Sequence, residues 1–188
     1  MRVALSGPSG CGMTTAIALV AKKLKLQPIN YTLRNLAKDK GMSFEEIHEK
    51  AKKDKRFDYE IDKREILAAR KDDVIIGSRL TIWLDQPEMY KKLGFAKGPE
   101  FDLKVWLTAP IEERARRISQ RDKKPFKQLL AYTKKRDAMN NARFKKLYGI
   151  DFDKHEDLVD LVIDNKRFTA EHTANLIVSA AQQLSRRN

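Results

Sequence analysis

The chain has 188 residues, of which 41% are hydrophobic and 35% are charged. This length suits one domain, and this apolar fraction allows a packed core and argues against disorder along the whole chain. One cysteine excludes a disulfide framework, and three dispersed histidines offer no zinc-binding spacing. Neither a signal-peptide pattern nor an apolar run of membrane-spanning length is present, so we expect a cytoplasmic protein without a membrane partner.

The charge of the chain is strongly basic and unevenly distributed. Lysine and arginine number 39 against 26 acidic residues, which gives a formal net charge of +13. Residues 112–146 contain thirteen basic and four acidic residues, and so carry most of the excess. Such an excess attracts nucleotides, nucleic acid or an anionic surface. A charged stretch alone is more often a solvated helix face, so its meaning depends on an accompanying phosphate-binding motif.

The first half of the chain alternates short apolar runs with helical patterns. Residues 2–6 (RVALS) predict a buried strand that stops at Gly7, and a helix follows the glycine-rich turn. Ser43 and Glu46 form a capping-box pattern, which predicts the start of a helix at Phe44. The remaining predicted elements here are a short strand at 26–29 and helices at 32–40, 44–53 and about 59–70.

The second half continues the alternation. Strands are predicted at 74–77, 103–107 and 158–163, and the proline- and glycine-punctuated residues 85–101 predict an excursion from the core. Pro110 is typical of the first turn of a helix, a long polar helix is predicted over about 125–147, and Thr169 is a predicted cap of the last helix. Strands alternating with helices indicate an α/β fold with a parallel sheet covered on both faces.

A glycine-rich segment between the first strand and the first helix is the most informative motif. It reads GPSGCGMTT and keeps the G-x-x-x-x-G frame of a P-loop. Gly10 and Gly12 allow backbone angles that turn successive amides inward, and the helix start adds unpaired donors, so a polyphosphate is the expected ligand. The predicted ATP-binding residues are Gly7, Pro8, Ser9, Gly10, Cys11, Gly12, Met13, Thr14 and Thr15.

Two positions of this motif, Met13 and Thr14, bear on how ATP and Mg²⁺ would bind. The Thr14 hydroxyl lies where a magnesium ligand belongs, so Mg²⁺ is expected beside ATP. Met13 stands where the motif usually has lysine and brings no charge to the phosphates. A glycine-rich turn that binds nothing is the alternative interpretation of the segment, and the correct strand–loop–helix context weighs against it.

With this motif in place, the whole chain resembles the archaeal-type cytidylate kinases, which are adenylate-kinase-like, P-loop nucleoside monophosphate kinases. The matching blocks, in order, are RNLA from Arg34, KGMSFEE from Lys40, GSRL from Gly77, WLTAPIEER from Trp106 and YGID from Tyr148. The resemblance covers nearly the full length, and in that subgroup the lysine position of the P-loop is commonly threonine. This chain departs from the family pattern at Pro28–Tyr31 and at Asn140.

The resemblance implies a single domain with a three-layer α/β/α fold around a central parallel sheet of about five strands. Its core would comprise residues 1–30, 72–120 and 150–188. A helical monophosphate-binding insert would occupy about 31–71, and an arginine-rich lid about 121–147. The implied activity is ATP-dependent phosphorylation of CMP and dCMP by a monomeric enzyme.

The resemblance also implies roles for individual side chains. Arg34 and Arg79 are candidates to hold the acceptor phosphate, because a guanidinium can bind two phosphate oxygens at once. Asp62 and Arg64 are candidates to contact the acceptor nucleoside. The lid candidates, which would neutralise the transferred phosphoryl group, are Arg117, Arg121, Arg136 and Arg143. A surface ion pair is the alternative role for each arginine taken alone.

Two other functions remain open at the level of sequence. The acceptor could be another small nucleotide such as UMP or AMP. Alternatively, the altered P-loop and the basic segment could belong to a catalytically impaired protein that binds RNA or a ribonucleoprotein. A nucleic-acid partner is expected only in that second case, in which RNA affinity would fall steeply with salt.

Overall fold

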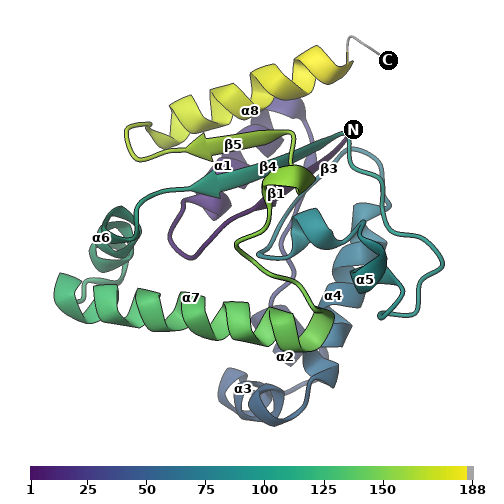
Figure 1. Ribbon diagram of the computed structural model, residues 1–188, viewed down its shortest axis with the longest axis vertical. Coiled ribbons are helices and arrows are strands. Elements are labelled where there is room, and N and C mark those ends of the chain that lie inside the picture. Colours follow the sequence, from purple (N-terminus) through teal and green to yellow (C-terminus); the bar gives the residue numbers. More distant parts are fainter. Residues whose placement is uncertain (186–188) are drawn as a thin grey trace.

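The computed structural model describes residues 1–185 and contains one five-stranded sheet (Figure 1). The strands lie in the order β2-β3-β1-β4-β5, and all four neighbouring pairs are parallel. This confirms the predicted parallel sheet of about five strands. The strands are β1 (Arg2–Ser6), β2 (Gln27–Ile29), β3 (Val74–Gly77), β4 (Leu103–Thr108) and β5 (Leu161–Asp164).

Helices and short turns connect these parallel strands. The helices are α1 (Met13–Leu24), α2 (Leu33–Asp39), α3 (Phe44–Lys53), α4 (Arg56–Ala69), α5 (Pro87–Tyr90), α6 (Ile111–Asp122), α7 (Phe126–Tyr148) and α8 (Ala170–Ser185), with 3₁₀ turns at Thr81–Trp83 and Glu156–Leu158. Thr169 Oγ1 accepts a hydrogen bond from the His172 amide at 3.1 Å, as its predicted capping role requires.

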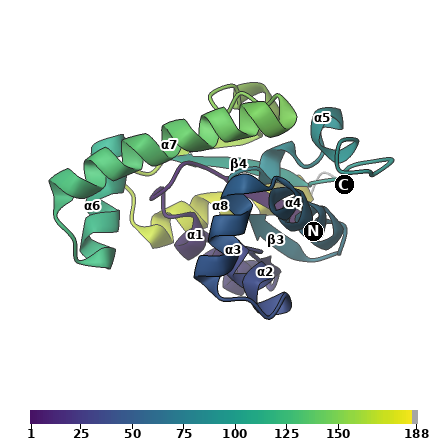
Figure 2. The same cartoon turned by 90° about the horizontal axis from the view of Figure 1, so that it is seen from below.

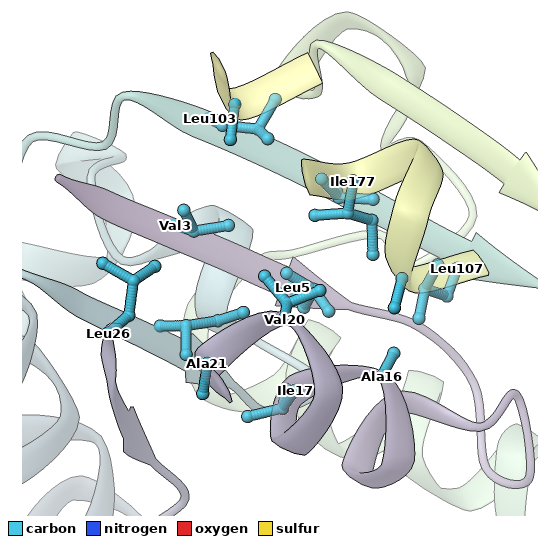
Figure 3. Close-up of a cluster of buried hydrophobic side chains, with 14 of the residues drawn as sticks. Val3, Leu5, Ala16, Ile17, Val20, Ala21, Leu26, Leu103, Leu107 and Ile177 are labelled. Carbon is cyan, nitrogen blue, oxygen red and sulfur yellow. The ribbon is translucent and has the colours of Figure 1, made fainter. Parts of the chain in front are cut away.

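One face of the sheet is covered by α1 and α8. Val3 and Leu5 of β1 point toward this face together with Leu107 of β4, and Val20 and Ile177 meet them from the two helices (Figure 3). All five side chains are at least 96% buried. The alternation of side chains along a strand therefore places every second apolar residue of β1 in this layer.

The other face is covered by α4, by the turn at Thr81–Trp83 and by the carboxyl-terminal end of α7 (Figure 2). Here an aromatic cluster forms, in which Trp83 stacks on Phe152 and meets the edge of Trp106 at centroid distances of 5.4 and 5.9 Å. Large rings fill the wider space between a sheet and a crossing helix. The two covered faces confirm the predicted three-layer α/β/α architecture.

Helices α2, α3 and the start of α4 project from the sheet at one end of α7 (Figure 1). Their own buried core is small and consists of Leu36, Ala37 and Ile47. A small apolar core stabilises such a segment weakly, so its position depends on polar ties to the rest of the molecule. The assignment of residues 31–71 to acceptor binding and of 121–147 to a lid stays a prediction.

Several predicted boundaries differ from the structure. The sequence places the last strand at 158–163, which is wrong at its start, because the Leu158 amide donates to the His155 carbonyl and closes a turn. Helix α4 begins at Arg56 instead of residue 59, where the Asp54 carboxylate accepts from the Arg56 amide at 2.9 Å. Pro110 lies just before α6 instead of within its first turn.

The prediction that residues 85–101 leave the core is also wrong. This segment contains the short helix α5 and buries Met89 and Leu93 completely or nearly so in the aromatic cluster. A Cβ on Gly98 would lie 2.7 Å from the Asp85 Cα, so the segment closes tightly on its own start. Met89 and Leu93 have the spacing of one helical turn, but the proline and glycine residues around them obscured this short pattern in the sequence.

Within residues 1–185, no helix is long and apolar enough to cross a membrane.

Candidate functional site

A cavity of about 890 Å³ opens at the carboxyl ends of the strands. The chain leaves β1 between its neighbours β3 and β4, which is where parallel α/β sheets usually bind ligands. One wall is the glycine-rich loop that follows β1. Other walls come from residues 30–33, from α4, from residues 77–80 after β3, from α6 and α7, and from the β5–α8 connection.

The loop after β1 has the backbone geometry of a phosphate cradle. Gly10 and Gly12 adopt φ angles of 82° and 89°, which favour glycine. A Cβ at Gly10 would lie 2.8 Å from the Arg114 carbonyl oxygen, so the loop also needs glycine there for close approach. Helix α1 follows directly, and its first-turn amides have no partner within the helix. These donors and the helix dipole favour an anion at this position.

Two buried side chains that sequence reasoning missed hold this loop in place. The Arg114 guanidinium donates to the Ser9 carbonyl at 3.0 Å and to the Asp137 carboxylate at 2.7 Å, which ties the loop to α7. Asn165 Nδ2 donates to the Cys11 carbonyl at 2.7 Å from the end of β5. Arg114 is only 7% exposed, and nothing in the charge pattern distinguishes it from its exposed neighbours on α6.

Arg79 and Arg136 bring two positive charges to the same cavity. Arg79 follows β3 and donates to the Ser9 hydroxyl at 2.8 Å, while its buried Nε has no partner among the described residues. Burial, and next the nearby charge of Arg136, lower the pKa of Arg79 to about 10. The Arg136 side chain lines the cavity from α7 and makes no hydrogen bond or close ion pair within residues 1–185. The hydrogen bond from Arg121, and more weakly the charge of Arg136, lower the pKa of Asp122. An anion bound between the two guanidinium groups would give Arg79 Nε a hydrogen-bond partner and would neutralise the charge of Arg136.

Arg117 and Arg121 line the cavity from α6, where each also has a protein partner. Arg117 donates to the side-chain and main-chain oxygens of Asn165 at 2.8 and 2.9 Å and to Glu113 at 3.1 Å. Arg121 pairs with its neighbour Asp122 at 2.7 Å. Arg117 therefore links α6 to the β5–α8 connection, and Arg121 keeps its charge near the cavity mouth.

Three predicted site arginines lie outside the cavity lining. Arg143 forms an ion pair with Asp58 and so ties α7 to α4. Arg64 pairs with Asp39 and with Glu60, and its guanidinium also lies over the Tyr31 ring. Arg34 is exposed and lies 4.1 Å from the centre of the Phe44 ring. Their predicted roles toward a nucleotide stay predictions, and the structure shows each of them in a contact with the protein itself.

Two acidic side chains of α4 are buried in the cavity wall. Asp62 is 8% exposed and accepts a hydrogen bond from the Tyr148 hydroxyl, and burial raises its pKa to about 7. Glu65 is 1% exposed, and burial followed by the charge of Asp62 raises its pKa to about 8. Sequence reasoning proposed Asp62 and missed Glu65, because a glutamate in a charged helix gives no sign of its burial.

Met13 and Thr14 begin helix α1 on different sides. The Met13 side chain is packed against the main core, and its Cγ lies 3.4 Å from where a Cβ on Gly77 would be. Thr14 is exposed at the cavity, so its hydroxyl is available to a bound group. Among residues 1–185, no cluster of three acidic, histidine or cysteine side chains could hold a metal unaided. A magnesium ion here would depend on Thr14 together with phosphate oxygens.

Comparisons with known proteins identify the family of the chain. A family model described as an AAA domain matches residues 3–143. Cytidylate kinase 2 from Borrelia garinii subsp. bavariensis is 34% identical over 180 residues, which cover 94% of each chain. The cytidylate kinase of Methanocaldococcus jannaschii is 32% identical over 188 residues, covering 99% of this chain and 100% of that relative.

Solved structures show the same fold at lower identity. A shikimate kinase from Bacteroides thetaiotaomicron has a TM-score of 0.63 at 14% identity, with 97% of this chain and 98% of that chain covered. The deoxyadenosine kinase of M. mycoides, with bound dATP, has a TM-score of 0.61 at 16% identity, with 97% and 100% covered. The full-length matches to the two curated relatives go further than the fold, and by them this chain belongs to the cytidylate kinase family of P-loop nucleoside monophosphate kinases.

Proposed function

We propose that this protein transfers the terminal phosphoryl group of ATP to CMP, and also to dCMP. The observation that supports this most directly is the meeting of Arg79 and Arg136 beside the P-loop in one cavity. Phosphoryl transfer needs positive charge placed where two phosphate groups meet, and no nucleophilic side chain. The name of both relatives, cytidylate kinase, supports the choice of CMP.

We assign the two nucleotides to two parts of the cavity lining, called here the donor end and the acceptor end. The donor end lies over the P-loop, between Arg117 on α6 and residues 165–173. The acceptor end lies between Tyr31 and the α4 residues Asp62 and Glu65, with Phe144 of α7 closing it. Arg79 and Arg136 lie with the P-loop in the lining shared by the two ends. A donor phosphate and an acceptor phosphate can therefore meet beside the two guanidinium groups.

In this proposal the P-loop amides bind the donor phosphates, and Arg79 holds the acceptor phosphate close to them. An oxygen of that phosphate forms the new bond to the γ-phosphorus while the bond to the β,γ-bridging oxygen breaks. Arg136 neutralises the charge that spreads over the transferred group. Arg117 and Arg121 add positive charge from α6. Closing of the 121–147 segment would exclude water and so suppress ATP hydrolysis.

The residues present also suit Mg²⁺. Thr14 Oγ1 would hold the ion, whose charge supplies further neutralisation of the phosphates when it is bound. The rest of its ligands would be phosphate oxygens and water, because the described residues around Thr14 provide no acidic cluster. Thr14 is exposed at the cavity and has room for such a complex.

The test is a phosphotransfer assay with a panel of acceptors. Purified protein is incubated with ATP–Mg²⁺ and, separately, with CMP, dCMP, UMP and AMP, and the diphosphates are quantified. We expect the highest kcat/KM with CMP, and a parallel preparation of the Arg79→Met variant controls for contaminating kinases. Diphosphate formation from none of the four acceptors would refute the proposal, and RNA binding that weakens steeply with salt would then favour the binding-protein alternative.

A further inference from the structure

Glu65 has a buried carboxylate oxygen that the protein does not satisfy. Its side chain lines the cavity and is 1% exposed. Its Oε1 atom is buried and has no hydrogen-bond partner among residues 1–185. A buried polar atom without a partner destabilises the folded state, and native proteins retain few of them. A carboxylate oxygen in a binding cavity that lacks a donor therefore points to a donor on the ligand.

A chain of hydroxyl groups determines which oxygen is left for the ligand. The Ser78 amide donates to Thr81 Oγ1 at 2.7 Å, and the Leu80 amide donates to Ser78 Oγ at 3.2 Å. Ser78 Oγ in turn donates to Glu65 Oε2 at 2.7 Å. Oε2 is thereby occupied and the carboxyl plane is held in one orientation. Oε1 is the atom that remains to accept from a ligand group in the cavity.

The walls around Glu65 suit a flat ring. Ile61 precedes it by one turn of α4 and lines the same cavity, and Tyr31 and Phe144 approach from two other segments. Asp62 adds a second carboxyl that Tyr148 already engages. Apolar and aromatic side chains with a few fixed polar groups are typical of a site for a nucleobase. Burial, followed by the charge of Asp62, raises the pKa of Glu65 to about 8.

We propose that Glu65 selects the acceptor base, its Oε1 accepting a hydrogen bond from the exocyclic amino group of a cytosine ring. This inference rests on the proposed function, in that the acceptor occupies this end of the cavity. Uracil presents a carbonyl oxygen at the same ring position, so its lone pairs would face Oε1 and leave both atoms unpaired. A site built to bind a donor rejects an analogue that lacks it far more strongly than an apolar pocket could.

A ribose contact is the competing role for this carboxylate, because ribose hydroxyls are donors as well. The two roles predict different effects of the base on acceptor binding. If Glu65 binds ribose, its loss affects CMP and UMP equally. If Glu65 binds the amino group, its loss affects CMP alone and the preference between the two acceptors collapses. The ratio of kcat/KM values therefore separates them.

The experiment combines a substitution in the protein with removal of the amino group from the ligand, in a double-mutant-cycle design. Wild type and Glu65→Gln are assayed with CMP, UMP and the monophosphate of 2-pyrimidinone riboside, which lacks only the amino group. Equilibrium binding of each monophosphate is measured in parallel by calorimetry. Glu60→Gln is the matched control, since it makes the same substitution on the same helix, where Glu60 pairs with Lys40 and Arg64 and lies outside the cavity lining.

The assays are run at pH 9, above the raised pKa of Glu65, so that its carboxyl group is ionised. Removal of the amino group should then lower kcat/KM and affinity by about 10- to 100-fold in wild type and in Glu60→Gln, as for a hydrogen bond to a charged group. In Glu65→Gln the preference for CMP should fall to within about threefold, because Ser78 Oγ donates to the amide oxygen and leaves the amide nitrogen, a donor, facing the ligand. An equal loss for CMP and UMP in Glu65→Gln, or an unchanged preference, would overturn the inference. The wild-type comparison of CMP with the pyrimidinone needs no variant, so equal binding of these two also refutes it if Glu65→Gln fails to fold.

The two proposals fail in different ways. If wild type phosphorylates none of these acceptors, the proposed kinase activity is refuted, and the binding measurements still decide the role of Glu65. If wild type phosphorylates CMP but the amino group makes no difference, the kinase proposal stands and the role given to Glu65 is refuted.

Discussion

The two ends of the cavity are built in different ways. At the donor end, Arg114 and Asn165 bind carbonyl oxygens of the P-loop from α6 and from the end of β5, and both are buried. At the acceptor end, α2 and α3 have a small apolar core, and α4 is tied to α7 by the Arg143–Asp58 ion pair as well as by apolar packing around Ile66. Buried side-chain bonds to backbone hold a loop in one geometry, whereas partly exposed ion pairs are weak and exchangeable.

This difference indicates a division of work along the cavity. The buried side-chain bonds fix the P-loop, whereas α2 and α3 have only a small buried core of their own. Arg79 belongs to the donor end, because it donates a hydrogen bond to Ser9 of the P-loop. Arg136 lies on α7, the helix that connects the donor end with the acceptor end. In Figure 1, α7 runs from α6 to the α2–α4 helices and thus spans the two ends. The following predictions test whether the two ends contribute as differently as their construction suggests.

The largest effect is expected at Arg79. Replacement by methionine (Arg79→Met) keeps much of the stem's packing and removes the charge that points to the P-loop. We expect kcat/KM for the phosphotransfer to fall at least about 10³-fold, as for other cationic groups aimed at a transferred phosphoryl group. Steady-state kinetics measure this effect, and thermal unfolding should show a stability equal to or above that of wild type, because a buried and underpartnered charge is removed. A loss below tenfold would contradict this assignment.

Arg136 and Arg143 form a matched pair on α7 that separates charge at the cavity from charge outside it. The Arg136→Gln variant should lose about 10²-fold in kcat/KM, since Arg136 lines the cavity without a hydrogen bond or close ion pair in residues 1–185. The Arg143→Gln variant should lose less than about tenfold and should unfold at a lower temperature, because Asp58 loses its partner. Equal kinetic losses in the two variants would show that both act on the substrates and that Arg143 leaves Asp58 during the reaction.

A smaller effect is expected in the pH dependence of stability. Glu65 has an ordinary pKa of 4.5 that burial raises to about 8, so the folded protein keeps a proton that the unfolded chain releases. Its contribution to stability is therefore complete below about pH 4.5 and is lost as the pH rises toward 8. Denaturant unfolding between pH 5 and 9, at constant ionic strength, should show a fall in the free energy of unfolding of at least about 1 kcal/mol.

The Glu65→Gln variant is the control for that titration, because glutamine binds no proton in this range. Its stability should depend less on pH than that of wild type, and what remains should follow Asp62, whose pKa burial raises to about 7. Identical pH profiles for wild type and Glu65→Gln would mean that Glu65 is ionised in the folded state throughout.

Sequence patterns were sufficient for the parts of this molecule that depend on local periodicity. The buried strands, the P-loop and the Ser43 cap were predicted because apolar runs, glycine spacing and a capping box act over a few residues. The burial of Arg114, Glu65 and Asn165 could not be predicted, because each depends on partners more than ten residues away in the chain. The ion pair between Arg143 and α4 and the packing of residues 85–101 in the core could not be predicted for the same reason, because both join residues far apart in the chain.

The smallest effect is expected at Met13, where a lysine is usual. The Met13 side chain packs against the main core next to Gly77, and the residue also lines the cavity. A lysine would have to bury its stem in that packing or leave it, and Arg79 and Arg136 already bring charge to the cavity. We therefore expect Met13→Lys to change ATP affinity and kcat by less than about tenfold, or roughly 1.4 kcal/mol. Calorimetry with a nonhydrolysable ATP analogue and steady-state kinetics measure both quantities, and Met13→Leu serves as the uncharged control. A gain of several orders of magnitude for the lysine variant alone would show that the donor end lacks charge that its arginines do not replace.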